Sequence, residues 1–137
     1  MLPLDGIRVI DMTTTLAGPY GSQILGDFGA DVIKIEAPGG DAIRNAGPQR
    51  HQGMAATFMG CNRNKRSAVL DLKTATGKDA LWKLLETAQV FLHAIRPQKM
   101  AALGFDAASV MQRRPDIVYA ALHGYHEHGP YGGRPAY

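Results

Sequence analysis

Short apolar runs alternate along the chain with segments whose apolar residues recur at helical spacing. The runs are rich in β-branched residues, which is typical of strands that are buried on both faces of a parallel sheet. They predict strands at residues 7–12, 31–36, 67–72, 90–95 and 117–122.

Two longer helices are predicted between these strands. Pro19 suits a first helical turn, and Gly26 and Gly29 weaken and end that helix. Thr76 is the expected N-cap of the second helix. Its apolar face, at helical spacing, is made by Leu81, Leu84, Leu85 and Ala88.

Shorter helices and two loops complete the pattern. The helices are expected at residues 54–62, from Pro97 to about Gly104, and from an Asp106 cap to just before Pro115. Residues 37–53 hold two prolines and four glycines and are predicted to have no regular structure. The residues after 122 read as a glycine- and histidine-rich loop. Strands that alternate with helices predict an α/β fold with a mostly parallel sheet.

Composition places the chain among globular proteins. With 137 residues, 45% of them hydrophobic and 20% charged, it is long enough for one domain with a packed core. The net charge of +3 is scattered, which argues against a nucleic-acid interface. The single Cys61 forms no internal disulfide and is expected to be packing. No apolar run is long enough for a membrane span and no signal peptide opens the chain, so a cytoplasmic protein is expected. The chain ends in a loop, which suggests a fragment.

Ligands of parallel α/β sheets bind at the carboxyl ends of the strands. The strand exits here are Thr13–Ala17, the loop after Glu36, Leu72–Lys73, Ala94–Arg96 and His123–Tyr125. Positive potential at this edge is expected from Lys73, Arg96, Arg44 and the cluster Arg63–Arg66. An anionic, nucleotide-like ligand would suit such an edge. For the cluster Arg63–Arg66, an ordinary solvated turn is the favoured interpretation and a contact to an anionic ligand is the alternative.

A nicotinamide dinucleotide fits the first turn poorly. Glu36 follows Gly18 by eighteen positions, close to the spacing of a ribose-binding acid. The dinucleotide-binding pattern is G-x-G-x-x-G. In the turn Gly18-Pro19-Tyr20-Gly21, however, Tyr20 fills the position of its second glycine, and Pro19 removes one N–H donor. We therefore expect no NAD.

Other chemistry-bearing residues also have plain structural interpretations. His123, His126 and His128 offer no rigid tetrahedral set of ligands, so no metal is expected. Asp11 and Asp71 end strands and could be bases, but capping a helix or pairing with lysine is favoured. His93 alternates with apolar neighbours and suits the core or the edge of the sheet. No nucleophile motif is present.

Four segments taken together resemble one known family. "LDGIRVIDMTTTLAGPYGSQILGDFGADVIKIEAPGGDAIR", "NRNKRSAVLDLKTATGKDAL", "RPQKMAALGF" and "RPDIVYAALHGYHEHGPYGGRPAY" resemble, in order and spacing, the amino-terminal part of the class III coenzyme A transferases. This family includes carnitine CoA-transferase, formyl-CoA transferase and α-methylacyl-CoA racemase. The resemblance covers nearly the whole chain.

The resemblance implies a Rossmann-like domain, of which residues 1–137 are the amino-terminal part, and a full-length homodimer of interlocked subunits. It implies that coenzyme A lies along the strand exits, with an acyl-CoA and a carboxylic acid as substrates and no nucleic acid or membrane partner. Thr15, Leu16 and Ala17 would lie by the thioester, and Leu70, Leu72 and Lys73 by the adenosine and phosphates. His123, Gly124 and Tyr125 would approach the pantetheine. The aspartate that attacks the thioester in such transferases would lie beyond Tyr137, so the fragment alone should be inactive.

The chain departs from the family's pattern at the CoA site. Where the family usually reads "ENFRPG", this sequence has "HAIRPQ", so Ala94 and Ile95 replace the asparagine and phenylalanine that help to hold CoA. Where the family frequently has an arginine, this chain has Ala102, and where the family often has a basic residue after the second strand, it has Ala37. Either the CoA site is remodelled or CoA binds weakly.

Two alternatives to an acyl-CoA:carboxylate CoA-transferase stay open. The family's racemases carry a catalytic histidine at the position of Tyr137, and a tyrosine is a poor base at neutral pH; this favours the transferase. The substitutions at the CoA site motivate the second alternative, an inactive CoA-binding subunit of a heteromeric transferase.

Overall fold

The computed structural model describes residues 1–126, 128–132 and 134. One five-stranded sheet organises this part of the chain, in the order β3-β2-β1-β4-β5, and all its neighbouring strands are parallel. The strands are β1 (Arg8–Met12), β2 (Asp31–Glu36), β3 (Lys65–Val69), β4 (Val90–His93) and β5 (Val118–Ala121). The predicted α/β fold with a parallel sheet is confirmed.

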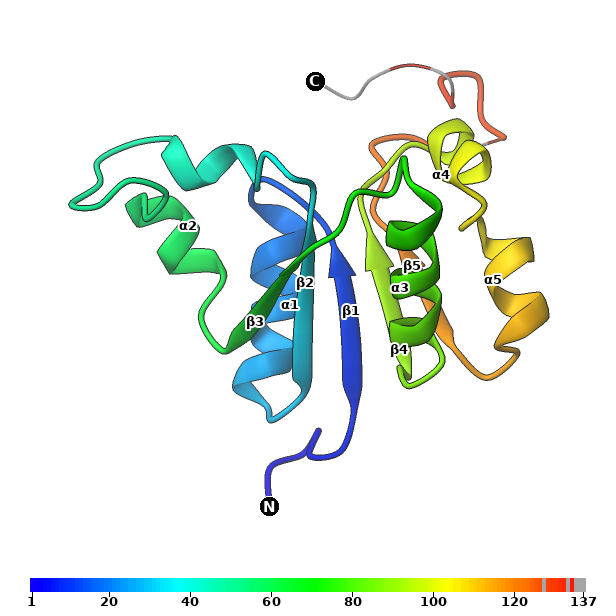
Figure 1. Cartoon of the computed structure of the whole chain (residues 1–137), viewed down its shortest axis with the longest axis horizontal. Coiled ribbons are helices and arrows are strands. Elements are labelled where there is room, and N and C mark those ends of the chain that lie inside the picture. Colours follow the sequence, from blue (N-terminus) through cyan, green and yellow to red (C-terminus); the bar gives the residue numbers. More distant parts are fainter. Residues whose placement is uncertain (127, 133, 135–137) are drawn as a thin grey trace.

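Helices cover both faces of the sheet (Figure 1). They are α1 (Ala17–Asp27), the 3₁₀ helix η1 (Ala42–Asn45), α2 (Ala56–Cys61), α3 (Ala75–Leu85), α4 (Pro97–Leu103) and α5 (Ala107–Arg113). The larger core lies between the sheet and α3, α4 and α5, where Ile10, Ile33 and Phe91 meet Leu81 and Val110. On the other face, Val9 and Val32 pack against Leu25 of α1.

Helix ends follow the local chemistry of the sequence. Pro97 opens α4, and Gly104 ends it with a left-handed φ of 84°. Asp106 caps α5 by accepting a hydrogen bond from Ser109 N at 3.1 Å. The predicted cap Thr76 is wrong: Thr74 is the N-cap of α3, and its Oγ1 accepts from Gly77 N at 3.0 Å.

Two further predictions are corrected by the structure. The third strand spans Lys65–Val69 instead of residues 67–72, because its register with β2 runs from Val32↔Lys65 to Glu36↔Val69. Residues 37–53 are not wholly irregular, because Asp41 accepts from Ile43 N at 3.2 Å and caps η1. In the described part of the chain, no helix has both the length and the apolar character that crossing a bilayer requires.

The strand order creates a switch point between β1 and β4. After β1 the chain builds β2 and β3 on one side, then returns to place β4 and β5 on the other. Loops that leave two neighbouring strands in opposite directions open a crevice at their carboxyl ends. In Figure 1 this is the upper edge of the sheet.

Candidate functional site

Two adjoining pockets follow the carboxyl ends of the strands. The first, of about 550 Å³, lies between the loop after β1 and the loop after β5. It is lined by residues 14–18, Ala94 and residues 121–124. The second, of about 630 Å³, is lined by residues 35–39, residues 70–73, Ile95 and Leu103. Thr14 lines both pockets, so they adjoin, and we call the two together the switch-point groove.

The residues predicted to hold a ligand are brought together by this groove, with one exception. The first pocket contains Thr15, Leu16, Ala17, His123 and Gly124. The second contains Leu70, Leu72, Lys73 and Ile95. Tyr125 instead lines a neighbouring pocket between α4, α5 and β5.

The loop after β1 is fixed by the buried carboxylate of Asp11. This carboxylate accepts hydrogen bonds from Thr13 N at 2.8 Å, from Thr13 Oγ1 at 2.5 Å and from Ser22 Oγ at 2.6 Å. Asp11, Thr13 and Ser22 are all fully buried. The favoured interpretation of Asp11 as a structural residue therefore agrees with its contacts, and a base role is not needed to explain it.

Gly18 is required by this arrangement. A Cβ on Gly18 would lie 2.7 Å from Thr13 Oγ1 and closer still to Thr13 Cβ. Glycine at the first turn of α1 therefore makes room for the side chain of Thr13. Thr15, two residues on, has a left-handed φ of 70°, which a non-glycine residue adopts only where its surroundings enforce it.

Two lysines with buried side chains contact the same loop. Lys34 Nζ donates to Thr13 O at 2.8 Å and forms an ion pair with Asp41 at 2.8 Å. Lys65 Nζ pairs with Asp11 at 3.1 Å and donates to Pro19 O at 2.7 Å. Burial lowers the pKa of Lys65, and the Asp11 carboxylate opposes that shift. Sequence reasoning missed both roles, although a lysine in the apolar run "VIKIE" was a signal of a buried charge.

The carboxylate of Glu36 also forms its hydrogen bonds within the protein. Its carboxylate accepts from Arg44 Nε at 2.6 Å, Ser67 Oγ at 2.6 Å and Asp41 N at 2.9 Å. Burial alone would raise the pKa of Glu36, but these donors, with Arg44 first, hold it at about 2. The oxygens of the Glu36 carboxylate are thus occupied by donors from the protein itself.

The predicted sources of positive charge are partly wrong. Arg44 is paired with Glu36, and the cluster Arg63–Arg66 lies at the amino end of β3, away from the groove. There Arg63 pairs with Asp27 and Arg66 with Asp31, both at 2.6 Å. The exposed cations that do line this edge are Lys73, Arg96 and Lys99, which form no ion pair among the described residues.

Three positions at which the sequence departs from the resembled family's pattern lie together. Ala94, Ile95 and Ala102 line a pocket of about 520 Å³ with Arg96 and Lys99. This pocket shares Ile95 and Leu103 with the second part of the groove, which Ala37 also lines. Small side chains here widen the groove beside two exposed cations.

The histidines are held by local contacts. His123 Nε2 lies 3.1 Å from Ile95 O, and His126 Nδ1 accepts from His128 N at 3.2 Å. Within residues 1–126, 128–132 and 134, no three His, Cys, Asp or Glu side chains gather as a metal site would require. His93 lies in the core, as one of the two predicted interpretations had it, and burial lowers its pKa to about 4.

The sequence profile of one family, described as CoA-transferase family III, matches residues 4–137. The chain belongs to CoA-transferase family III. The resemblance drawn from the motifs is therefore confirmed. Tyr137, whose identity separates racemases from transferases in that resemblance, lies outside the described residues.

The chain is similar to several known proteins and solved structures. "Probable fatty acyl-CoA transferase Rv3272" of Mycobacterium tuberculosis is 44% identical over 136 residues, which are 97% of this chain and 34% of that protein. "Succinyl-CoA--L-malate CoA-transferase beta subunit" of Chloroflexus aurantiacus is 39% identical over 139 residues, 99% of this chain and 34% of that protein. The crystal structure of a CAIB/BAIF family protein from Brucella suis has a TM-score of 0.94 at 37% identity, covering 99% of this chain and 37% of that chain. The chain thus spans about a third of the length of the curated relatives it matches.

Proposed function

We propose that residues 1–137 are the amino-terminal part of the CoA-binding domain of a cytoplasmic acyl-CoA:carboxylate CoA-transferase, which works as an interlocked homodimer when full length. The observation that carries this proposal is the switch-point groove. Its two adjoining pockets contain the loop at Thr15–Ala17 and the turn at Leu70–Lys73, at the edge where α/β sheets bind nucleotides.

Each end of the groove suits a different end of an acyl-CoA. Leu70 and Leu72 offer apolar surface for the adenine, beside the exposed ammonium of Lys73. Lys73, Arg96 and Lys99 would attract the phosphates, because unpaired cations around a concave site focus positive potential into it. The thioester would then reach the pocket at Thr15–Ala17.

The first turn of α1 is suited to the thioester carbonyl. Leu16, the N-cap, makes no side-chain capping bond, so the N–H groups of Ala17 and Gly18 are not capped by it. Donors at a helix N-terminus that point into a pocket stabilise an oxyanion as it develops on the carbonyl. The lysine and aspartate contacts beneath Thr13 keep this loop in one geometry.

The covalent chemistry would come from an aspartate that follows Tyr137. Its carboxylate attacks the thioester carbon, the C–S bond breaks and the CoA thiolate departs. The product on the enzyme is an acyl–aspartyl anhydride. The thiolate then attacks the aspartyl carbonyl, which releases the first acid and leaves an aspartyl-CoA thioester. The acceptor carboxylate takes CoA by the reverse of these two steps.

The proposal is tested by incubating full-length protein with an unlabelled acyl-CoA and a ¹⁴C-labelled carboxylic acid. A labelled CoA thioester, formed without net hydrolysis, supports it. Calorimetry that detects no CoA binding by the full-length protein would refute it. Deuterium entering the α-carbon of a 2-methylacyl-CoA without any acceptor acid would instead show a racemase.

One observation favours a second candidate, a CoA-binding subunit that needs a companion. The relative from Chloroflexus aurantiacus is named as a beta subunit. Ala94 and Ala102, which stand where the family resemblance expects polar side chains, line the pocket beside the groove. This candidate predicts CoA binding without turnover by the full-length protein alone, and turnover when the companion subunit is added.

A further inference from the structure

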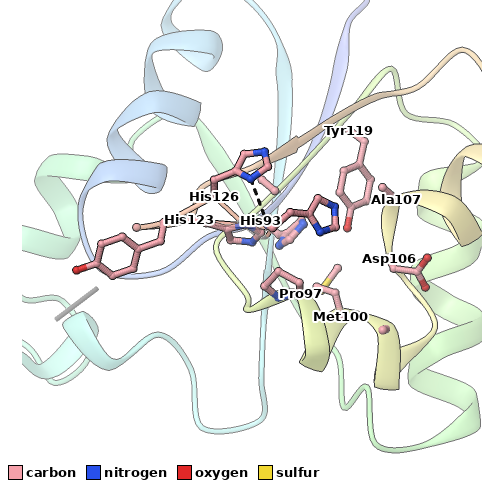
Figure 2. Close-up of a pocket in the computed structure, with 13 residues that line it drawn as sticks. His93, Pro97, Met100, Asp106, Ala107, Tyr119, His123 and His126 are labelled. Carbon is pink, nitrogen blue, oxygen red and sulfur yellow. Dashed lines mark hydrogen bonds between the residues drawn. The ribbon is translucent and has the colours of Figure 1, made fainter. Parts of the chain in front are cut away.

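A pocket of about 710 Å³ lies beside the groove, between α4, the start of α5, β5 and the loop after it. Figure 2 shows Pro97 and Met100 below His93, with Tyr119, Ala107 and Asp106 to its right. We call it the α4–α5 pocket. It shares Ala121, His123 and Gly124 with the proposed thioester end of the groove, so the two pockets adjoin at these residues.

Most polar side chains of the α4–α5 pocket have a partner within the protein. Both carboxylate oxygens of Asp106 accept from Ser109, at 3.1 and 2.8 Å. Tyr119 Oη donates to Phe105 O at 2.9 Å, and His123 Nε2 lies 3.1 Å from Ile95 O. These contacts fix the walls of the pocket.

His93 differs from these residues. Its ring is 1% exposed, and its Nδ1 accepts from Ile95 N at 3.2 Å. Burial keeps the ring neutral by lowering its pKa to about 4. Because Nδ1 of this neutral ring accepts a hydrogen bond, its proton is on Nε2. That Nε2 is buried and has no hydrogen-bond partner in the described part of the chain.

An unpaired buried donor is unfavourable, and a ligand oxygen that meets it removes the penalty. The other surfaces define what that ligand is. Pro97, Met100 and Ala107 are apolar, and the polar lining includes histidines and the Asp106 carboxylate but no Lys or Arg among the described residues. A ligand carboxylate there would meet the like charge of Asp106 without a Lys or Arg to pair with, whereas an uncharged oxygen on an apolar chain would be satisfied by one neutral donor.

We infer that the α4–α5 pocket holds the acyl group of the thioester, and that its preferred ligand is an acyl chain with an uncharged hydroxyl or keto oxygen that accepts a hydrogen bond from His93 Nε2. The inference rests on the proposed function and names the substrate class of that same site. It excludes dicarboxylic acyl groups as the preferred substrates.

The test compares the affinity of the full-length protein for four thioesters by calorimetry: butyryl-CoA, 3-hydroxybutyryl-CoA, 3-oxobutyryl-CoA and succinyl-CoA. One net hydrogen bond predicts that a 3-oxygen strengthens binding about 2- to 10-fold over butyryl-CoA. The two oxygenated thioesters distinguish a hydroxyl from a keto ligand. His93→Phe, which keeps a ring but removes the donor, should abolish the preference. His51→Phe, at an exposed position outside the pocket, is the matched control.

A second pair of variants avoids the buried ring. Ala107 is exposed and lines the pocket, whereas its neighbour Ala108 is exposed and does not. Ala107→Leu should weaken binding of the four-carbon thioesters relative to CoA itself, and Ala108→Leu should not. Succinyl-CoA binding more tightly than 3-hydroxybutyryl-CoA, or equal effects of the two leucine variants, would overturn the inference. If no thioester or CoA binds at all, the proposed function itself fails.

Discussion

Gly18→Ala tests whether the first turn of α1 is built around the side chain of Thr13. The new Cβ would overlap Thr13, coming within 2.7 Å of its Oγ1. Thr13 cannot yield easily, because both its N–H and its hydroxyl donate to the buried Asp11 carboxylate.

The magnitude follows from these two contacts. Overpacking a core position costs about 1–3 kcal/mol, and displacing Thr13 from a charged acceptor costs about 1.5–3 kcal/mol. The free energy of unfolding should therefore fall by roughly 2.5–6 kcal/mol, the sum of these two estimates.

Gly21→Ala is the matched control. Gly21 lies in the same helix, and a Cβ there would meet no atom within 4 Å. Replacing a helical glycine with alanine in open space should stabilise the fold by about 0.5–1 kcal/mol. Urea unfolding of the 137-residue chain, followed by circular dichroism, measures both variants. If Gly18→Ala lowers stability no more than Gly21→Ala, the explanation of this turn is refuted.

Three other predictions concern charge and exposed surface. Lys65→Met should lower the free energy of unfolding by about 3–5 kcal/mol, because it leaves the buried Asp11 carboxylate without its ion-pair partner. Arg63→Met removes an exposed ion pair and should lower it by under about 1 kcal/mol. Equal losses of the two variants in urea unfolding would contradict this. The pKa of His93 in the folded chain is about 4, against an ordinary 6.5, so the unfolded chain binds more protons between these values. Stability should fall as the pH drops from 6.5 to 4, by about 3 kcal/mol more than in His93→Phe, and parallel pH profiles of the two proteins would be the contrary result. Val69, Val118 and Met111 are 60%, 59% and 47% exposed, so the 137-residue chain should self-associate in sedimentation velocity, and a monodisperse monomer would disagree.

Periodicity was sufficient to predict the central strands β1, β2 and β4, because these strands are mostly buried and so leave continuous apolar runs. It misplaced β3 for a specific reason. Leu70 and Leu72 continue the apolar pattern of the third run, but they leave the sheet and line the groove instead. An apolar side chain that faces a ligand site looks the same in the sequence as one that faces a core.

The position of the groove could also be predicted, since the carboxyl ends of parallel strands share one edge. The charges around it could not. Arg63–Arg66 spans the amino end of β3 and so lies at the opposite edge, which becomes clear only when the strand register is known. The buried pair Lys34–Asp41 was hidden for another reason: Asp41 lies in a segment whose glycines and prolines gave no sign of order.

Thr74 and Thr76 show the limit of local rules. Either threonine suits an N-cap by type, but Thr74 N donates to Asp71 O at 3.0 Å and forms the turn that starts α3. Gly77 is needed at this turn because a Cβ there would collide with the backbone of Asp71. Thr74 rather than Thr76 is therefore the N-cap, because Thr74 lies in this turn, which also places Lys73 in the groove.

A crystal structure of the full-length protein with acetyl-CoA is the most direct test of the switch-point groove as a CoA site. We predict the thioester carbonyl against the N–H groups of Ala17 and Gly18, and the adenosine against Leu70 and Leu72. Acetyl-CoA bound at any other edge of the sheet, or a groove left empty at saturating ligand, would contradict this.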